Sequence, residues 1–451
     1  MPATDTRNLS PAATLCVVLA LAWFPPAAAD TQPADAYAEA MAAGLFAEAE
    51  TLAKERLEAA IAAGRREALD TAELFSDLAR AQRLKGDIDA ARQNYELAVE
   101  LIEARRDMLD PALVRPLRGI AETHIDARRP DLALPFIDRA LHVRQVNEGP
   151  HSLGQAPALE LLVTAHRQMG ELDEAAAAAE RLHFVYARAY PGKRMEVVPA
   201  LLRKGRAYGE MGDRRKERDA YERAAAIVRH NEGDASPHMI EPLIHLGRSH
   251  QDEYFIAYVV ATAAEELPDD KLLREAQDYF ESAREIAARA DPDQHWELII
   301  AAELAAGDFH TLKDDAGPAG IRYREAWRLL TVYDEKGDRR RREFESVVPL
   351  LEVLPDLSVA LPFNADTDGA LPRYDTGVIV TQFTITRRGR TKDIGLVDIT
   401  PSRNDAVETE VKKSLRRRVY RPRFENGFAV DAPGQTIRYE FPVPRSAAEA
   451  R

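Results

Sequence analysis

A repeat of 42 residues constrains this chain more than any other feature. Gly44, Gly86, Gly170 and Gly212 fall on one 42-residue spacing, and Arg128 occupies the remaining mark. Apolar residues recur three and four positions apart on both sides of these marks, as expected for amphipathic helices. The spacing therefore predicts helix–turn–helix units joined head to tail. Such units stack into a solenoid, because one unit cannot bury its apolar face alone.

In several units the first helix carries a large residue followed by a small one, and the second carries alanine, a bulky residue and alanine. One unit has Leu78-Ala79 followed by Ala91, Tyr95 and Ala98. This pattern resembles the tetratricopeptide-repeat (TPR) family in a 42-residue form. The resemblance covers residues 35–333, within a helical repeat domain that we assign to residues 30–337.

The fifth unit departs from the spacing. It begins at Leu246-Gly247, but its second helix is delayed to Ala276, Phe280 and Ala283, which indicates an insertion of about 17 residues. Helical patterns continue over residues 296–304 and 321–332. These predict a degenerate repeat or a capping helix pair.

The TPR resemblance implies a groove, lined by the first helix of each unit, that binds extended peptides. The groove-facing positions carry six arginines, and guanidinium groups at this pitch suit a peptide that bears carboxylates. The alternative is that these arginines are solvated and pair with nearby glutamates. The predicted groove residues are Arg80, Arg83, Arg118, Arg167, Arg206 and Arg248.

The C-terminal part changes from helical to strand patterns. Residues 338–375 predict a helix remnant followed by a proline-containing linker, and residues 376–445 predict a small α+β domain of order β-β-α-β. A loop at 364–375 has oxygen-bearing side chains spaced as in an EF-hand, but Pro372 and Asp375 depart from that pattern and favour a polar turn. We therefore assign no metal site.

The ordered motifs of the last domain resemble the C-terminal domain of TonB, the periplasmic energy transducer. They are a glycine hairpin at 387–390, the stretch Tyr420-Arg421-Pro422, a turn at Asn426-Gly427 and a closing Tyr-x-Phe strand. The resemblance implies docking by strand addition, in which an exposed edge pairs with a partner's backbone. The predicted edge residues are Thr436, Ile437, Arg438, Tyr439, Glu440 and Phe441.

The first 29 residues predict a secretory signal. Arg7 precedes an apolar run from Ala12 to Phe24, and prolines and small residues follow up to Ala29. Cleavage there would remove Cys16, the single cysteine, and leave no membrane-spanning segment. With the TonB resemblance, this predicts a periplasmic protein of a Gram-negative bacterium. The alternative is a retained membrane anchor.

Composition and motifs restrict the function further. The chain is 45% hydrophobic and has a formal charge of −14, whereas residues 376–445 hold 14 Lys and Arg against 8 Asp and Glu. One cysteine excludes zinc ribbons and cysteine-ligated clusters. No sequence motif of a hydrolase, metalloprotease, P-loop or dinucleotide site occurs, so we predict neither an enzyme nor a cofactor. An acidic chain with few interleaved aromatics also argues against nucleic acid as a partner.

Two functions remain. The first is a non-enzymatic periplasmic adaptor that binds a partner segment in the TPR groove and docks through the TonB-like domain. Its expected partners are other envelope proteins or peptide segments, with peptidoglycan or an outer-membrane transporter as further candidates for the basic domain. The second is a TonB-type energy transducer or an accessory of an outer-membrane transport system. Cleavage of the signal distinguishes them, because a transducer needs its membrane anchor.

Overall fold

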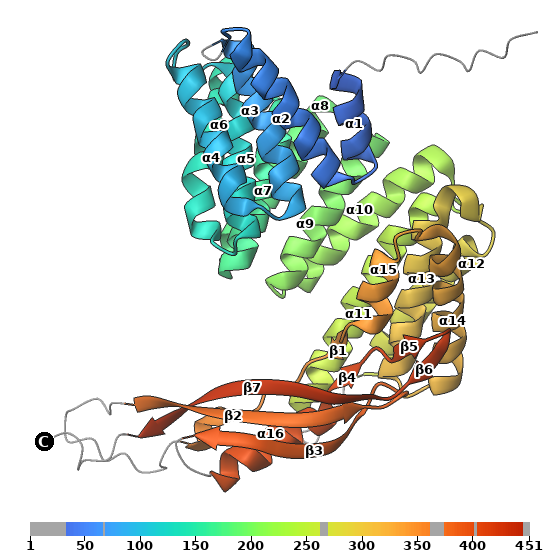
Figure 1. The fold of residues 1–451 in the computed structure, drawn as a ribbon. Helices are drawn as coiled ribbons and strands as arrows, with labels where there is room; N and C mark the ends of the chain where they lie inside the picture. The colour runs from blue at the N-terminus through green and yellow to red at the C-terminus, as the bar shows by residue number, and fades with distance from the viewer. Residues whose placement is uncertain (1–32, 66–67, 262–268, 361–373, 401–403, 445–451) are drawn as a thin grey trace, which may run out of the picture. The chain divides into compact units, whose positions relative to one another are not determined.

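The computed structural model describes residues 33–65, 68–261, 269–360, 374–400 and 404–444 (Figure 1). The predicted signal at 1–29 and most of the EF-hand-like loop at 364–375 lie outside these residues. The chain divides between Thr123 and His124 into two compact units.

The first unit consists of antiparallel helices packed through small residues. Tyr37, Ala49, Leu57 and Leu78 meet in its core, where alanines allow the helices to approach closely. Its last helix, α5, runs past the unit boundary to Asp126. The elements are α1 (Pro33–Ala42), α2 (Phe46–Ala62), α3 (Leu69–Lys85), α4 (Ile88–Glu103), η1 (Pro111–Leu113) and α5 (Val114–Asp126).

The second unit continues the helical hairpins. Short 3-10 turns precede several of the first helices, and each hairpin packs against the next. The elements are α6 (Pro130–Glu148), η2 (Leu153–Gln155), α7 (Ala156–Met169), α8 (Leu172–Ala189), η3 (Met195–Val197), α9 (Val198–Glu210), α10 (Arg214–Glu232), η4 (Pro237–Met239), α11 (Ile240–Ala261), α12 (Lys271–Ala287), α13 (Pro292–Leu312) and α14 (Ala316–Tyr333). The chain is thus a TPR-like solenoid over most of its described length.

All five repeat marks adopt a left-handed backbone conformation between two helices. Gly86 ends α3 with φ of +105°, and Gly170 ends α7 with φ of +77°. Arg128 adopts φ of +59° at the mark that lacks a glycine. A left-handed conformation favours glycine, so the repeat geometry imposes it here on a residue that rarely adopts it.

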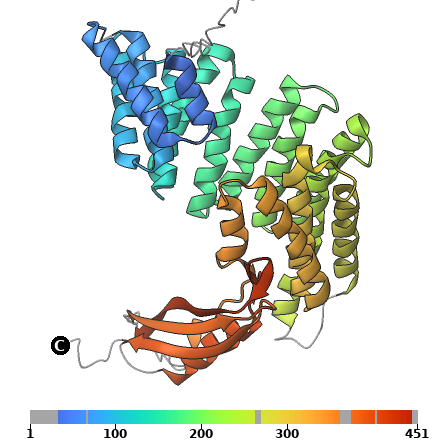
Figure 2. The same cartoon turned by 45° about the vertical axis from the view of Figure 1, so that its right-hand side comes forward.

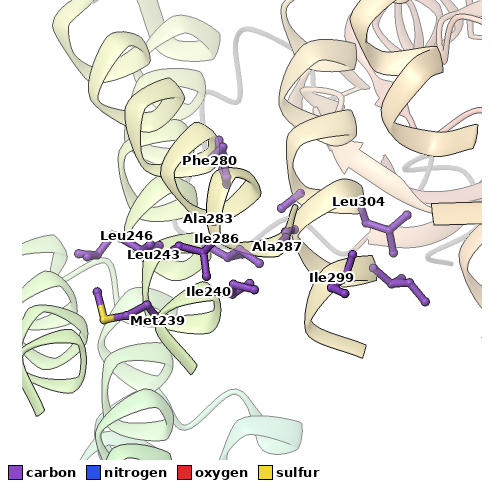
Figure 3. Packing of buried hydrophobic residues seen from close by; sticks show 14 of the residues in the cluster. Met239, Ile240, Leu243, Leu246, Phe280, Ala283, Ile286, Ala287, Ile299 and Leu304 are labelled. Carbon is purple, nitrogen blue, oxygen red and sulfur yellow. The ribbon is translucent and has the colours of Figure 1, made fainter. Parts of the chain in front are cut away.

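The expected insertion lies in the α11–α12 hairpin. Helix α11 has 22 residues, and Ala276, Phe280 and Ala283 are buried on α12 as predicted. Figure 3 shows how this hairpin joins the following one: Met239, Ile240, Leu243 and Leu246 pack toward Phe280, Ala283, Ile286 and Ala287, with Ile299 and Leu304 alongside. The apolar core therefore continues from α11 and α12 into α13.

The C-terminal strands form a three-stranded antiparallel sheet of order β3-β2-β7 (Figures 1 and 2). Helix α16 packs on one face, where Val407, Val411 and Leu415 meet Ile379 and Phe383. Asn404 caps this helix by accepting a hydrogen bond from the Val407 N–H at 3.2 Å. The elements are β2 (Tyr374–Ile385), β3 (Thr391–Thr400), α16 (Asp405–Arg417) and β7 (Ala432–Pro444).

Short strands that the sequence did not predict lie between α16 and β7. Strands β5 (Arg423–Glu425) and β6 (Phe428–Val430) form a hairpin through the predicted Asn426-Gly427 turn, with φ of +52° and +81° at the two turn residues. Strand β4 (Val419–Tyr420) pairs with β1 (Pro349–Leu351). The predicted β-β-α-β order is therefore present with these additions.

The stretch 338–375, for which the sequence predicts a helix remnant and a linker, differs from that prediction beyond the helix. Helical turns α15 (Asp338–Arg340) and η5 (Arg341–Glu345) occupy the predicted remnant, and a 3-10 turn η6 (Leu357–Ala360) comes after β1. However, Phe344 is fully buried against Phe424, with ring centroids 5.0 Å apart, and both belong to the core formed by α9–α14. Within residues 338–360, η5 thus packs on the last helices of the solenoid and β1 pairs with β4, where the sequence predicts a helix remnant and a linker.

A candidate interaction site on the helical repeats

The six predicted groove arginines divide into paired and unpaired groups. In the first unit, the Glu122 carboxylate forms ion pairs with Arg83 Nη2, at 2.9 Å, and with Arg118 Nη2, at 3.3 Å. Arg80 is exposed and forms no ion pair with a described residue. The local pairing that the sequence left open as an alternative therefore holds for Arg83 and Arg118.

The second unit repeats this division. Arg167 donates from Nε to Glu210 at 2.6 Å. Arg206 on α9 and Arg248 on α11 occupy equivalent positions of successive units, are exposed, and have no ion-pair partner among the described residues. These two guanidinium groups therefore keep their hydrogen-bond donors available to a ligand.

Arg206 borders a cavity of about 510 Å³ between α9, η4 and α11. Its volume lies within the roughly 300–1,000 Å³ typical of ligand sites. The lining combines apolar side chains with charged ones, and Glu232 accepts a hydrogen bond from His238 at 2.7 Å. The lining residues are Met195, Val198, Pro199, Leu202, Arg203, Arg206, Glu232, His238, Glu241 and Leu298.

Arg203 lines the same cavity and was missed by the sequence reasoning. It lies one helical turn before Arg206 and forms an ion pair with Glu160 at 3.2 Å. The available signal was the spacing of three residues, which places two side chains on one face of a helix. The cavity lining thus carries two arginines together with two carboxylates, Glu232 and Glu241.

Beneath the arginines the repeat packing is tight. A Cβ added at Gly205 would lie 2.4 Å from the Tyr221 ring, so glycine is needed where α10 crosses α9. His245 of α11 stacks on that ring with centroids 4.8 Å apart. Burial lowers the pKa of His245, and the charges of Arg248 and Arg206 act in the same direction. His245 is therefore harder to protonate in the folded chain than a free histidine.

The predicted edge strand lies at an edge of the sheet. Strand β7 pairs only with β2 among the described strands, with Ile379 opposite Tyr439 and Gly377 opposite Phe441. Along β7, every second residue points its N–H and C=O groups away from β2, toward the open edge of the sheet, where a partner strand can pair with them. Arg438 and Glu440 form an exposed ion pair there at 3.2 Å.

The described part of the chain contains no group of three or more His, Cys, Asp or Glu side chains arranged to hold a metal ion. None of its helices has the length and apolar character needed to cross a bilayer.

Comparison with known proteins finds the repeat and little else. Residues 72–105 match the model of the tetratricopeptide repeat. No curated protein matches the chain. Solved structures that resemble it include BtubC (BKLC) from P. vanneervenii (21% identity over 45% of this chain and 80% of that chain, TM-score 0.40). Another is a putative kinesin light chain with TPR-like repeats from Podosopora anserina (16% identity over 48% of this chain and 94% of that chain, TM-score 0.40). A third is pilF of Pseudomonas aeruginosa (14% identity over 63% of this chain and 100% of that chain, TM-score 0.35).

Proposed function

We propose that this protein is a non-enzymatic periplasmic adaptor whose helical repeats bind an extended, carboxylate-bearing segment of another protein. The TPR-like solenoid supports this proposal, because stacked repeats provide long binding surfaces and TPR repeats are typically interaction scaffolds. The TonB-like domain would supply a second contact by strand addition. Other envelope proteins, and peptidoglycan or an outer-membrane transporter at the basic domain, are the partners we expect.

One observation carries the proposal most directly. Of the arginines at equivalent repeat positions in the second unit, Arg206 and Arg248 stay unpaired in the described structure, although the chain is rich in carboxylates. A guanidinium fork binds a carboxylate through two parallel hydrogen bonds. The cavity beside Arg206 offers apolar contacts from Val198, Leu202 and Leu298 for a side chain of the same segment.

The experiment compares two double variants of the full chain in capturing proteins from envelope extract. Arg206→Ala with Arg248→Ala should lose the captured partner while keeping the circular dichroism of the wild type. Arg181→Ala with Arg215→Ala is the matched control, since both arginines are exposed on second helices, α8 and α10. Equal capture by both double variants would refute the role of the unpaired arginines.

The strand-addition contact is tested by proline at two neighbouring positions. Proline removes a backbone N–H, and neighbouring residues of a strand point their N–H groups to opposite sides. Of Arg438→Pro and Tyr439→Pro, one therefore breaks the pairing with β2 and the other removes a donor only from the open edge. The edge-facing variant should keep its fold and lose the partner that the wild-type chain binds through this strand. Unchanged binding would refute this contact.

The location is tested by sequencing the N-terminus of the protein recovered from cells. A mature chain beginning at Asp30 and found in the periplasmic fraction supports the adaptor. A chain that retains residues 1–29 in the inner membrane instead supports the energy transducer.

A further inference from the structure

A second cavity, of about 690 Å³, lies where the C-terminal domain packs on the insertion hairpin. We call it the junction pocket. Its walls come from α11, α12, the end of α13, β1, the β2–β3 hairpin, α16 and β4. The lining residues are Tyr254, Phe255, Tyr258, Val259, Leu273, Leu312, Lys313, Asp314, Leu351, Arg390, Lys413, Arg416, Arg417 and Val419.

The floor of the junction pocket is apolar. Phe255, Leu312 and Val419 form a small buried cluster, with Tyr254 and Leu351 packed against it. Tyr254 and Tyr258 lie one turn apart on α11 with nearly parallel rings, and Tyr258 is 37% exposed. Aromatic rings at an open floor suit an apolar side chain of a ligand.

The rim of the pocket is strongly positive, in contrast to the chain as a whole. Five Lys and Arg side chains line it, against the single carboxylate of Asp314, whereas the formal charge of the protein is −14. The Asp314 carboxylate lies 3.6 Å from Arg390 and is thus already engaged. The pocket therefore has an excess of positive charge that attracts anions.

Hydrogen bonds to neighbouring groups position several of these cations. Arg417 donates to the Val259 carbonyl at 2.8 Å, and Lys313 donates to Gln277 at 3.1 Å. Lys413 pairs with Glu410 at 3.1 Å. Arg416 is exposed and has no ion-pair or hydrogen-bond partner among the described residues. Arg416 is therefore the cation best placed to bind a ligand.

We propose that the junction pocket binds an acidic peptide segment through one apolar anchor side chain and carboxylates on both sides of it. The positive groups come from separate elements: Lys413 and Arg416 lie one turn apart on α16, whereas Lys313 follows α13 and Arg390 follows the β2–β3 turn. This distribution around an apolar floor matches a chain with several carboxylates. A lipid or an inorganic anion would present one compact charge. The site is separate from the arginines of α9 and α11.

The test measures fluorescence anisotropy with the full chain and a labelled octapeptide that has one phenylalanine between two pairs of glutamates. We expect saturable binding that weakens with added salt. The same peptide with glutamine in place of glutamate, or alanine in place of phenylalanine, should bind about tenfold more weakly. Equal binding of the glutamine peptide would overturn the proposal. Binding of the chain to vesicles of anionic phospholipid without binding of the octapeptide would also overturn the proposal. Complete displacement of the octapeptide by inorganic phosphate would do the same.

Two pairs of variants locate the binding. Arg416→Glu should weaken octapeptide binding about tenfold, and Arg181→Glu, the same change at an exposed position of α8, should not. Tyr258→Ala should weaken it similarly, whereas Ile256→Ala, at a 56% exposed position of the same helix that does not line the pocket, should leave it unchanged. If neither Arg416→Glu nor Tyr258→Ala differs from its control, the junction pocket is not the site. Arg206→Ala with Arg248→Ala should not affect this peptide, so failure of the repeat-groove proposal would be seen separately.

Discussion

Arg421 donates two hydrogen bonds to the carboxylate of Asp308, from Nε to Oδ1 at 2.8 Å and from Nη2 to Oδ2 at 2.7 Å. Arg421 follows β4 in the C-terminal domain, and Asp308 lies on α13 of the solenoid; both side chains are under 10% exposed. Tyr323 and Glu343 complete the network by bonding to Asp308 and Arg421, respectively. Burial acts to lower the pKa of Arg421, but the charge and hydrogen bonds of Asp308 outweigh it, so the net shift is upward.

Arg421→Met should destabilise the protein by about 3–5 kcal/mol, because it leaves the Asp308 carboxylate buried without its partner. Urea unfolding checks this. Adding Asp308→Leu to Arg421→Met should recover part of the loss, since the uncompensated charge is removed. Arg438→Ala is the control, because its pair with Glu440 is more than 60% exposed and should contribute less than about 1 kcal/mol. A loss for Arg421→Met no larger than that of the control would show that the two parts are not joined through this pair.

Phe424→Ala should cost about 3–5 kcal/mol, as expected for removing a buried aromatic ring. Phe424 is 1% exposed and lies against Phe344 and Tyr323, within the core of the last helical hairpins. Phe428, on the other strand of the same β-hairpin, is 69% exposed, so Phe428→Ala should change stability by less than about 0.5 kcal/mol. Thermal unfolding of both variants measures the difference, and similar melting temperatures would contradict the packing.

The repeat could be predicted from the sequence because each unit buries the same residue types at the same intervals. Even the last helical hairpin, α13–α14, has the residue intervals of the earlier units. Its small and aromatic residues are spaced as in the unit of Ala79, Ala91, Tyr95 and Ala98; they are Gly307, Ala319, Tyr323 and Ala326. We predicted only a degenerate or capping pair there, since the insertion moved this hairpin off the 42-residue spacing. The intervals within the unit, and not the spacing between units, identify this hairpin.

The packing of the C-terminal domain on the solenoid could not be predicted in the same way. It depends on contacts between distant residues, such as Arg421 with Asp308, and on two- and three-residue strands that have no periodicity. A proline-containing stretch with four arginines looks solvated in sequence, although Phe344 within it is fully buried. For the candidate groove, the repeat predicts the positions of the arginines, but only the folded structure distinguishes the unpaired Arg206 from the paired Arg167.

Gly205→Ala should destabilise the solenoid by about 1–3 kcal/mol, because the new Cβ would lie 2.4 Å from the Tyr221 ring and force the two helices apart. Gly317 in the first turn of α14 has no atom within 4 Å of such a Cβ, so Gly317→Ala should be neutral or stabilise by up to about 1 kcal/mol. The urea midpoint of Gly205→Ala should therefore fall, whereas that of Gly317→Ala should stay unchanged or rise. Equal midpoints would show that α9 and α10 can separate without cost.

The buried histidines should make the protein less stable as the pH falls below about 6.5, the ordinary pKa of histidine. Burial lowers the pKa of His245 in the folded chain; the interaction of its ring with the Glu241 carboxylate, which accepts a hydrogen bond, opposes this shift, whereas the charges of Arg248 and Arg206 reinforce it. The unfolded chain therefore binds this proton more readily than the folded chain. The stability that this histidine contributes is fully present above its pKa in the unfolded chain. It is lost as the pH falls from that value toward its pKa in the folded chain. Burial also lowers the pKa values of His183, His250 and His310.

His245→Phe should reduce this acid sensitivity, because the ring stack on Tyr221 is kept and the titrating group is lost. The measurement is the change in free energy of unfolding between about pH 7.5 and pH 5.5 in urea, where the variant should lose less stability than the wild type. His142→Gln, at an exposed position of α6, should follow the wild type. An unchanged pH dependence in His245→Phe would mean that His245 is as readily protonated in the folded chain as in the unfolded one. Its burial beneath Arg206 and Arg248 would then have no effect on its charge.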